Sequence, residues 1–446
     1  SDKISKNNLK KYYAYSHVPA PNTIFENIYQ LEPGEKITID SKKLKLSKSI
    51  YWDLSNGPDY NIFFKKNETT QFNNTFEKII DDHTIADKSP ALCLSGGLDS
   101  YIIMKNLTKL KKKFSSFTLG FENKSFDEAN YVKEIKEDFK KEIIYSNSDG
   151  LKKNFLELIK FISDPIGDSS IVPTYIIHKK IKNYTNVAIG GDGGDESFFG
   201  YITFDAFNLA IKIKKLLPNF FLKLIKKIFR MGSISHDYIT FSTKVRRFLN
   251  SINLKNEHLL PSWMGCINSS DMSILFNEKI TEDFMFSSSN LIFSNNLNLM
   301  RSSQLYHFKF YLPMILRKVD QASMYNSVES RSPFLSKKII NFSLDQKVNK
   351  LYKFFKKKHF LKMTYKNIVP NAVLNRSKHG FAFPKENILL DENLINKIID
   401  FSLLVNKSFF EKKYKNFLNK TEDSSQYLWN ELILNLTLQN LRNLRH

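Results

Sequence analysis

The feature that most constrains this chain is a regular alternation of short apolar runs with stretches of helical spacing between residues 72 and 189. Short apolar runs bounded by glycine or polar turns are typical of buried strands, and apolar residues three and four positions apart are typical of helices. The pattern predicts helices at Phe72–His83, Ser100–Leu110 and Asp127–Phe139, and strands at Ala91–Leu94, Phe114–Phe121, Glu142–Tyr145 and Val187–Ile189. Strands joined by helices form right-handed βαβ units, so we expect an α/β fold with a parallel sheet. Helical patterns dominate from about Phe199 onward and predict an α-rich C-terminal region.

The N-terminal segment, residues 1–54, lacks this alternation of strands and helices. Glu32-Pro-Gly34 marks a turn and Ile37-Thr-Ile39 alternates apolar and polar positions, which predicts a short β-rich segment. The stretch Ser55–Thr70 that follows is polar, rich in Asn and Lys, and has the composition of a linker. We therefore expect one domain over residues 1–54 and a second over residues 71–446.

Charge and cysteine content exclude several classes of protein. The formal net charge is +22, but the basic residues are spread along the whole chain without an RNA- or DNA-binding signature. A solvated lysine surface is therefore preferred over a nucleic-acid site. No stretch approaches the roughly 20 apolar residues of a membrane span. Cys93 and Cys266 lie far apart without CxxC spacing, which argues against a disulfide framework or zinc site and for a reducing, cytoplasmic location.

The hexapeptide Ser95-Gly-Gly-Leu-Asp-Ser100 lies between an expected strand and an expected helix. In a parallel sheet such a loop lies at the carboxyl edge, where α/β proteins bind ligands. Two glycines let the backbone approach an anion, and the N–H groups at the helix start then form a nest for phosphate. The carboxylate of Asp99 suits a Mg²⁺ ion bridging to phosphate oxygens. The alternative is a glycine turn in which Asp and Ser cap a helix.

A second glycine-rich segment, Gly190-Gly-Asp-Gly-Gly-Asp-Glu196, follows the strand expected at Val187–Ile189. Its three carboxylates repel one another and its four glycines cost backbone entropy, so a metal ion or a phosphate should compensate. The alternatives are a plain acidic turn or a Ca²⁺ loop, but the spacing is not that of an EF-hand.

A third segment, Leu312–Leu335, has helical spacing followed by a proline-terminated loop and carries a cationic cluster. Arg317, Lys318 and Arg331 could bind a carboxylate or phosphate. By composition alone, surface ion pairs are the preferred interpretation of this cluster. Lys378, in Arg376-Ser-Lys-His-Gly-Phe381, could be no more than an exposed lysine at a helix end.

These three segments together resemble a known family. The hexapeptide resembles the PP-loop of the N-type ATP pyrophosphatases, which cleave ATP between its α and β phosphates to adenylate a substrate. The second and third segments are similar to the asparagine synthetase patterns S-G-E-G-x-D-E-x-F-x-G-Y and L-P-x-x-x-L-R-K-x-D. The resemblance implies Mg²⁺ at Asp99 and Asp195. It also implies ATP contacts at Cys93, Leu94, Ser95, Gly96, Gly97, Leu98, Asp99, Ser100, Leu119, Gly120, Gly190 and Gly191.

The resemblance further implies roles in the chemistry. Asp192 replaces the family glutamate that takes part in forming the adenylate and handling ammonia, so the carboxylate is one methylene shorter. Lys378 matches the family lysine that reaches the adenylate, Arg331 would act with it, and Lys318 and Arg331 would bind the carboxylate substrate. The implied reaction converts L-aspartate through a β-aspartyl-adenylate to L-asparagine, with ATP and Mg²⁺ as cofactors.

The start of the chain resembles the last part of the glutaminase domain of the same family, on Val18-Pro-Ala-Pro21 and Leu31-Glu-Pro-Gly34. Position 1 is Ser, and no cysteine precedes Cys93, so these residues cannot hydrolyse glutamine. Ammonia would come from glutamine through a glutaminase domain absent from this chain, and the resemblance is compatible with a homodimer. Two alternatives stay open: an amidotransferase of the family acting on a sugar acid, a peptide or a β-amino acid, and a catalytically silent homologue. The Tyr–Glu pair expected of the β-lactam-forming relatives cannot be located by motif.

Overall fold

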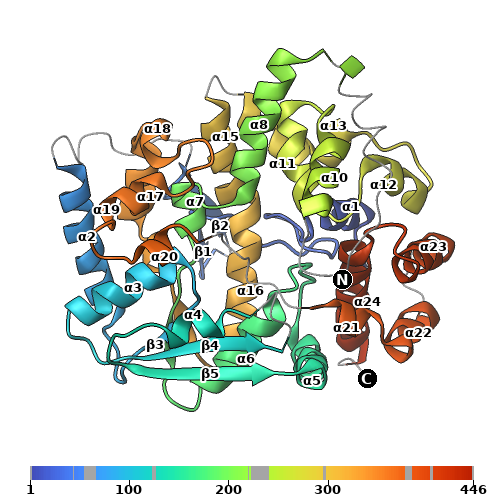
Figure 1. Ribbon diagram of the computed structural model, residues 1–446. Helices are drawn as coiled ribbons and strands as arrows, with labels where there is room; N and C mark the ends of the chain where they lie inside the picture. Colours follow the sequence, from blue (N-terminus) through green and yellow to red (C-terminus); the bar gives the residue numbers. More distant parts are fainter. Residues whose placement is uncertain are drawn as a thin grey trace.

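The computed structural model describes residues 3–43, 45–54, 67–122, 127–218, 220–221, 241–294, 298–376, 384–401 and 405–443 (Figure 1). Its centre is a parallel sheet of five strands, ordered β5-β4-β3-β6-β7. In chain order the strands are β3 (Ala91–Cys93), β4 (Ser115–Phe121), β5 (Lys140–Ser146), β6 (Val187–Ile189) and β7 (Glu329–Arg331). The chain adds β4 and β5 on one side of β3, then crosses to add β6 and β7 on the other. The order of the strands therefore reverses between β3 and β6, and ligands of open α/β sheets bind at such a point.

The expected α/β fold is confirmed, with two differences in the sheet region. The helix expected at Asp127–Phe139 is only α4 (Ala129–Lys133), because β5 starts at Lys140 and residues 134–139 are needed to reach it. Phe139 anchors that crossing by stacking on Phe114, with ring centroids 4.9 Å apart. Strand β7 was not expected, since its three residues are polar and gain strand geometry only by pairing with β6.

Helices pack around the sheet and form most of the chain beyond it. Those before β6 are α2 (Glu68–His83), α3 (Leu98–Lys109), α5 (Ser148–Leu158) and α6 (Ile171–Ile181). After β6 the chain forms α7 (Gly194–Phe198), α8 (Ile202–Leu216), α10 (Phe241–Ser251), α11 (Asn256–Met264), α12 (Ser269–Phe276), α13 (Glu282–Met285), α14 (Ser287–Ser294), α15 (Leu299–Tyr306), α16 (Leu312–Met324), α17 (Lys337–Asp345), α18 (Val348–Leu351), α19 (His359–Thr364), α20 (Asn371–Leu374), α21 (Glu386–Leu389), α22 (Glu392–Phe401), α23 (Lys407–Leu418) and α24 (Ser425–Asn443).

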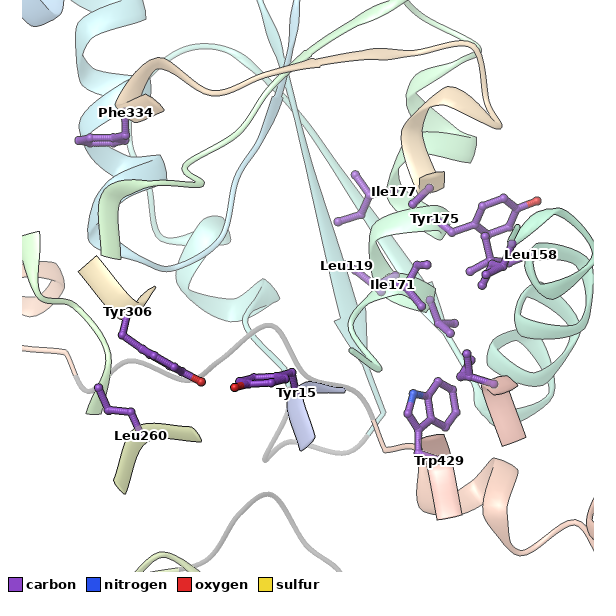
Figure 2. Close-up of a cluster of buried hydrophobic side chains, with 14 of the residues drawn as sticks. Tyr15, Leu119, Leu158, Ile171, Tyr175, Ile177, Leu260, Tyr306, Phe334 and Trp429 are labelled. Atoms are coloured by element: carbon purple, nitrogen blue, oxygen red, sulfur yellow. The ribbon is translucent and has the colours of Figure 1, made fainter. Parts of the chain in front are cut away.

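The two ends of the described chain share one hydrophobic core with the sheet. Helix α1 (Lys6–Tyr15), which the sequence did not predict, lies beside the C-terminal helix α24 (Figure 1). The hydroxyl of Tyr13 donates to Glu431 Oε1 at 2.7 Å. Figure 2 shows Trp429 of α24 near Leu158 and Ile171, within the same cluster of buried side chains. Helix α1 therefore packs as part of the α/β body.

The β-rich part of the N-terminal segment is an antiparallel hairpin of β1 (Glu35–Asp40) and β2 (Lys45–Ile50). Ile39 is paired with Leu46, and Ile37 and Ile50 lie on the same face as this pair because side chains alternate along a strand. This apolar hairpin face is open to solvent, with Ile39 and Ile50 each 66% exposed. The division between residues 1–54 and 71–446 stays a prediction.

Candidate active site

A pocket lies at the carboxyl ends of β3 and β6, where the strand order reverses. Its walls come from the loop after β3, the end of β4, helix α6, the loop after β6, helix α16 and the segment 357–376. Most of the residues assigned from sequence line it: Cys93, Leu94, Ser95, Gly96, Gly97, Leu98, Asp99, Ser100, Leu119, Gly190, Gly191, Asp192, Asp195 and Lys318. The fold thus brings together segments as far apart in the sequence as Cys93 and Lys318, as expected for an α/β ligand site.

The first loop is held in shape by its two serines. Ser95 N–H donates to Ser100 Oγ at 3.2 Å, and Ser100 Oγ donates back to the Ser95 carbonyl at 3.0 Å. Gly97 is extended, with φ of −82°, and its N–H donates to Ser95 Oγ at 3.2 Å. An ideal Cβ on Gly96 would lie 1.4 Å from Arg376 Nη1, so a larger residue there would displace the guanidinium group. The loop therefore exposes bare backbone to a guanidinium group.

The second loop needs its glycines for close approach and for one left-handed residue. Gly193 has a φ of +89°, which a residue with a Cβ adopts only under strain. A Cβ on Gly194 would lie 2.7 Å from Asp99 Cγ. A Cβ on Gly200 would lie 1.8 Å from Asp195 Oδ1. The glycines therefore let the two loops pack closely enough for their carboxylates to face one site.

Lys358 lies between those two carboxylates. Its Nζ is 2.8 Å from Asp195 Oδ1 and also pairs with Asp99 Oδ2. The side chains of Lys358, Asp195 and Asp99 are only 7%, 11% and 12% exposed. The sequence did not assign Lys358, because it stands in a lysine run within a lysine-rich chain.

The two carboxylates fit a magnesium ion shared with phosphate oxygens. Asp99 Oδ1 is buried without a hydrogen-bond partner. Across the described part of the chain, no group of three or more His, Cys, Asp or Glu residues could hold a metal by itself. Mg²⁺ is commonly bound through one or two carboxylates, with substrate phosphates and water completing the shell. Asp99 and Asp195 offer that kind of site.

Cationic groups surround the first loop. The Arg376 guanidinium lies 3.4 Å from the ring centroid of Tyr131 and 3.3 Å from Glu128 Oε1, while its buried Nη1 has no hydrogen-bond partner. Lys357 and Lys362 also line the pocket, and burial lowers the pKa of each ammonium group. A phosphate chain on the loop would meet this positive wall. Lys378 lies outside the described residues.

Helix α6, helix α16 and the loop after β6 form a second wall with a different chemistry, which we call the acyl wall: His178, Lys318 and Asp192. Lys318 Nζ donates to Ser170 Oγ at 2.9 Å and lies 3.5 Å from Asp168 Oδ2. His178 was not assigned from sequence, where one histidine on an apolar helix carries no signal. The acyl wall presents a cation, a carboxylate and an imidazole to one space.

Three further pocket residues have perturbed acid–base behaviour. Burial raises the pKa of the Cys93 thiol to about 12, so it stays protonated and unreactive. Burial likewise raises the pKa of Glu196 to about 7, although the Tyr201 hydroxyl donates to its Oε1 at 2.6 Å. Both Glu196 and Tyr201 belong to the asparagine synthetase pattern. This Tyr–Glu pair therefore does not by itself distinguish one member of the family from another.

Two assigned residues lie elsewhere. Arg331 Nη1 donates to the backbone carbonyls of His83 and Ile85 at 3.0 and 2.8 Å, and its Nε pairs with Glu329. The side chain thus ties β7 to the end of α2 and does not line the pocket. Gly120 packs against the Tyr145 ring, which would lie 2.6 Å from a Cβ there.

Glycine loops after two adjacent strands at the reversal of a parallel sheet, with facing carboxylates, define a PP-loop α/β domain. Comparison with known proteins agrees: the family model described as asparagine synthase matches residues 71–440. The chain belongs to the asparagine synthase family.

Curated relatives match over different parts of the chain. A putative glutamine-hydrolysing asparagine synthetase 2 of Methanocaldococcus jannaschii is 32% identical over 45% of the chain and 39% of its own length. Glutamine-hydrolysing asparagine synthetase 1 of Bacillus subtilis is 23% identical over 96% of the chain and 68% of its own length. Amidase chry2 of Gibberella zeae is 22% identical over 82% of the chain and 60% of its own length. The chain thus spans only part of each relative.

Among the described residues, no helix combines the length and apolar character required to cross a membrane.

Proposed function

We propose that this chain activates a carboxylate with ATP and converts it to an amide, with release of AMP and pyrophosphate. The observation that carries the proposal is the pair Asp99 and Asp195, which two separate glycine loops bring to one cation at the reversal of the sheet. Two carboxylates that face one site suit a Mg²⁺ ion shared with the phosphates of a nucleotide. The proposed enzyme is a ligase of the asparagine synthetase type.

Each wall of the pocket contributes to the proposed first step. The backbone of the loop Ser95–Ser100 would hold the phosphates, and Leu119 would border the adenine. Asp99 and Asp195 would hold Mg²⁺, which supplies neutralisation of phosphate charge when bound. Lys358 and Arg376 add positive charge near the leaving pyrophosphate, and Lys378 would do so at the α-phosphate. Charge that develops in the transition state thereby meets groups already in place.

L-aspartate is the acceptor that we propose. Lys318 supplies a cationic partner for a substrate carboxylate on the acyl wall, and Asp192, which lines the same pocket, would accept a proton from the attacking ammonia. Arg331, tied to α2, would have to release its carbonyl partners to take part in substrate binding. A sugar acid would use the same cation, so exchange measured with each acid separates the two alternatives. A silent homologue is disfavoured because a protein without catalysis gains nothing from two glycine loops that bring Asp99 and Asp195 to one site.

We propose glutamine as the ammonia source, through a glutaminase domain that covers the apolar hairpin face. Two-stranded sheets are marginal alone and need a hydrophobic face covered for stability. Ile39, Leu46 and Ile50 are 53% to 66% exposed, so this face has room for such a partner. The two synthetases among the relatives carry glutamine hydrolysis in their names, and both are longer than this chain. A homodimer and a cytoplasmic location stay predictions.

ATP–pyrophosphate exchange tests the proposal, because exchange reports adenylation without needing ammonia. L-aspartate should support exchange, and Asp99→Ala should abolish it while leaving the fold intact. Asp82→Ala is the matched control, because Asp82 is an exposed carboxylate on α2 that does not line the pocket. Undiminished exchange in Asp99→Ala would remove the central claim. Exchange with sugar acids but not with aspartate would favour the amidotransferase alternative.

A further inference from the structure

His178 is a buried polar residue that lines the pocket. The side chain is 3% exposed and stands on α6. Its Nδ1 lies 2.8 Å from the backbone carbonyl of Thr174, one helical turn earlier. Because a carbonyl can only accept, Nδ1 carries the proton when the ring is neutral, and Nε2 then presents a lone pair. Nε2 is buried without a hydrogen-bond partner, and His178 lines the pocket.

The surroundings of His178 place it on the acyl wall rather than near the phosphates. Burial lowers its pKa, so the ring is neutral near pH 7. The charged groups that act on the ring are Asp192, which favours the cation, and Lys318, which opposes it. These are the residues to which the proposed function gives the amine and the carboxylate. The loop that would hold the phosphates is not among them.

An imidazole nitrogen without a hydrogen-bond partner does not by itself indicate a site, and His17 provides a comparison within the same chain. His17 is equally buried, its Nδ1 lies 3.0 Å from the Tyr15 carbonyl, and its Nε2 also lacks a partner. His17 does not line the pocket, and its charged neighbour is Arg317. Of these two histidines, only His178 combines the free acceptor with the pocket and a nearby carboxylate.

We infer that His178 contacts the amine nucleophile, accepting a hydrogen bond from its N–H through Nε2 during attack on the acyl-adenylate. The inference rests on the proposed function and deepens it. An acceptor nitrogen and the Asp192 carboxylate form a pair of sites for N–H donors, such as ammonia or a primary amine. Such contacts orient the nitrogen lone pair toward the acyl carbon.

The step balances without a further reagent. The nitrogen lone pair forms the new C–N bond, the bond between the acyl carbon and the phosphate oxygen breaks, and AMP leaves with that electron pair. The attacking nitrogen loses one proton, which passes to Asp192 or, through Nε2, to His178. His178 is thus a residue of the second half-reaction, whereas adenylation does not require it.

Comparison of the two half-reactions tests this assignment with the variants His178→Leu, His178→Gln and, as matched control, His17→Leu. ATP–pyrophosphate exchange should stay within about three-fold of wild type in all three. In amide formation, His178→Leu should raise the KM for ammonium about ten-fold, the loss of one hydrogen bond worth ~1.4 kcal/mol. His178→Gln should recover part of this, because its amide oxygen also accepts. His17→Leu should leave the KM unchanged.

Several outcomes would overturn the inference. A raised KM for ATP in exchange would assign His178 to the nucleotide, and an unchanged KM for ammonium would remove its contact with the amine. Equal effects of His17→Leu and His178→Leu would show a structural cause, and thermal melting of each variant would locate it. If the wild-type protein shows no ATP–pyrophosphate exchange with any carboxylate tested, the proposed function itself is contradicted, and this inference with it.

Discussion

Replacement of Lys358 by methionine tests how the pocket is held together before nucleotide binds. Lys358 is buried between Asp99 and Asp195, with Nζ 2.8 Å from Asp195 Oδ1. For an effective dielectric constant of about 20, one contact at 2.8 Å provides roughly 6 kcal/mol of gross attraction. The cost of removing the charges from water cancels part of this. Loss of one partner from a buried ion pair therefore costs about 3–5 kcal/mol, because the other charge stays buried.

We expect Lys358→Met to lose about 3 kcal/mol or more of unfolding free energy, measured by urea unfolding followed by tryptophan fluorescence. Addition of Mg²⁺ should recover more stability in the variant than in wild type, because a divalent cation can take the place of the ammonium group. Pyrophosphate exchange should fall by about 10²-fold, as for loss of one preorganised charge partner.

Two comparisons separate electrostatics from packing. In the double variant Asp99→Asn/Lys358→Met, one negative charge is removed as well, so part of the lost stability should return. Lys350→Met removes a half-exposed lysine paired with Glu68 and should cost less than about 1 kcal/mol. An unfolding free energy of Lys358→Met within about 0.5 kcal/mol of wild type, with no coupling to Asp99, would refute the reasoning.

Three further predictions concern other parts of the structure. Gly194→Ala places a Cβ 2.7 Å from Asp99 Cγ, so it should reduce pyrophosphate exchange at least ten-fold with little change in melting temperature. Retained exchange would show that the two loops can separate. Arg331→Met should lower the unfolding free energy by about 1–3 kcal/mol, because the hydrogen bonds to the carbonyls of His83 and Ile85 are lost. A raised KM for the carboxylate with unchanged stability would instead show that Arg331 binds the substrate. Burial raises the pKa of Glu431 to about 7. The protonated carboxyl stabilises the fold below about pH 4.5, and this contribution is lost as pH rises through 7. The unfolding free energy of Glu431→Gln, measured in urea, should therefore rise by about 2–3 kcal/mol relative to wild type across that range. A difference between the two proteins that does not change with pH would argue against the raised pKa.

The core of the fold could be predicted because local signals and topology agree there. Ala91–Leu94 is apolar and ends at two glycines, which identifies a buried strand followed by a loop. Strand β7 had no such signal, since Glu329–Arg331 is polar and extended only because β6 offers an edge. The direction of the Arg331 side chain follows from that pairing, so sequence could assign its charge but not its partner. Lys358 was hidden for a different reason: with 67 Lys and Arg residues in the chain, three consecutive lysines carry no information.

The two walls of the pocket differ in how strongly the backbone determines them. On the phosphate side, Gly194 and Gly200 leave no room for a Cβ, so the approach of the loops follows from chain geometry and can be read from motifs. The acyl wall is made of side chains, with His178 on α6, Lys318 on α16 and Asp192 in the loop after β6. We expect preference for the carboxylate and the amine to depend on the acyl wall: substitutions at Lys318 should change which carboxylate supports exchange, and substitutions at His178 should change the use of ammonium.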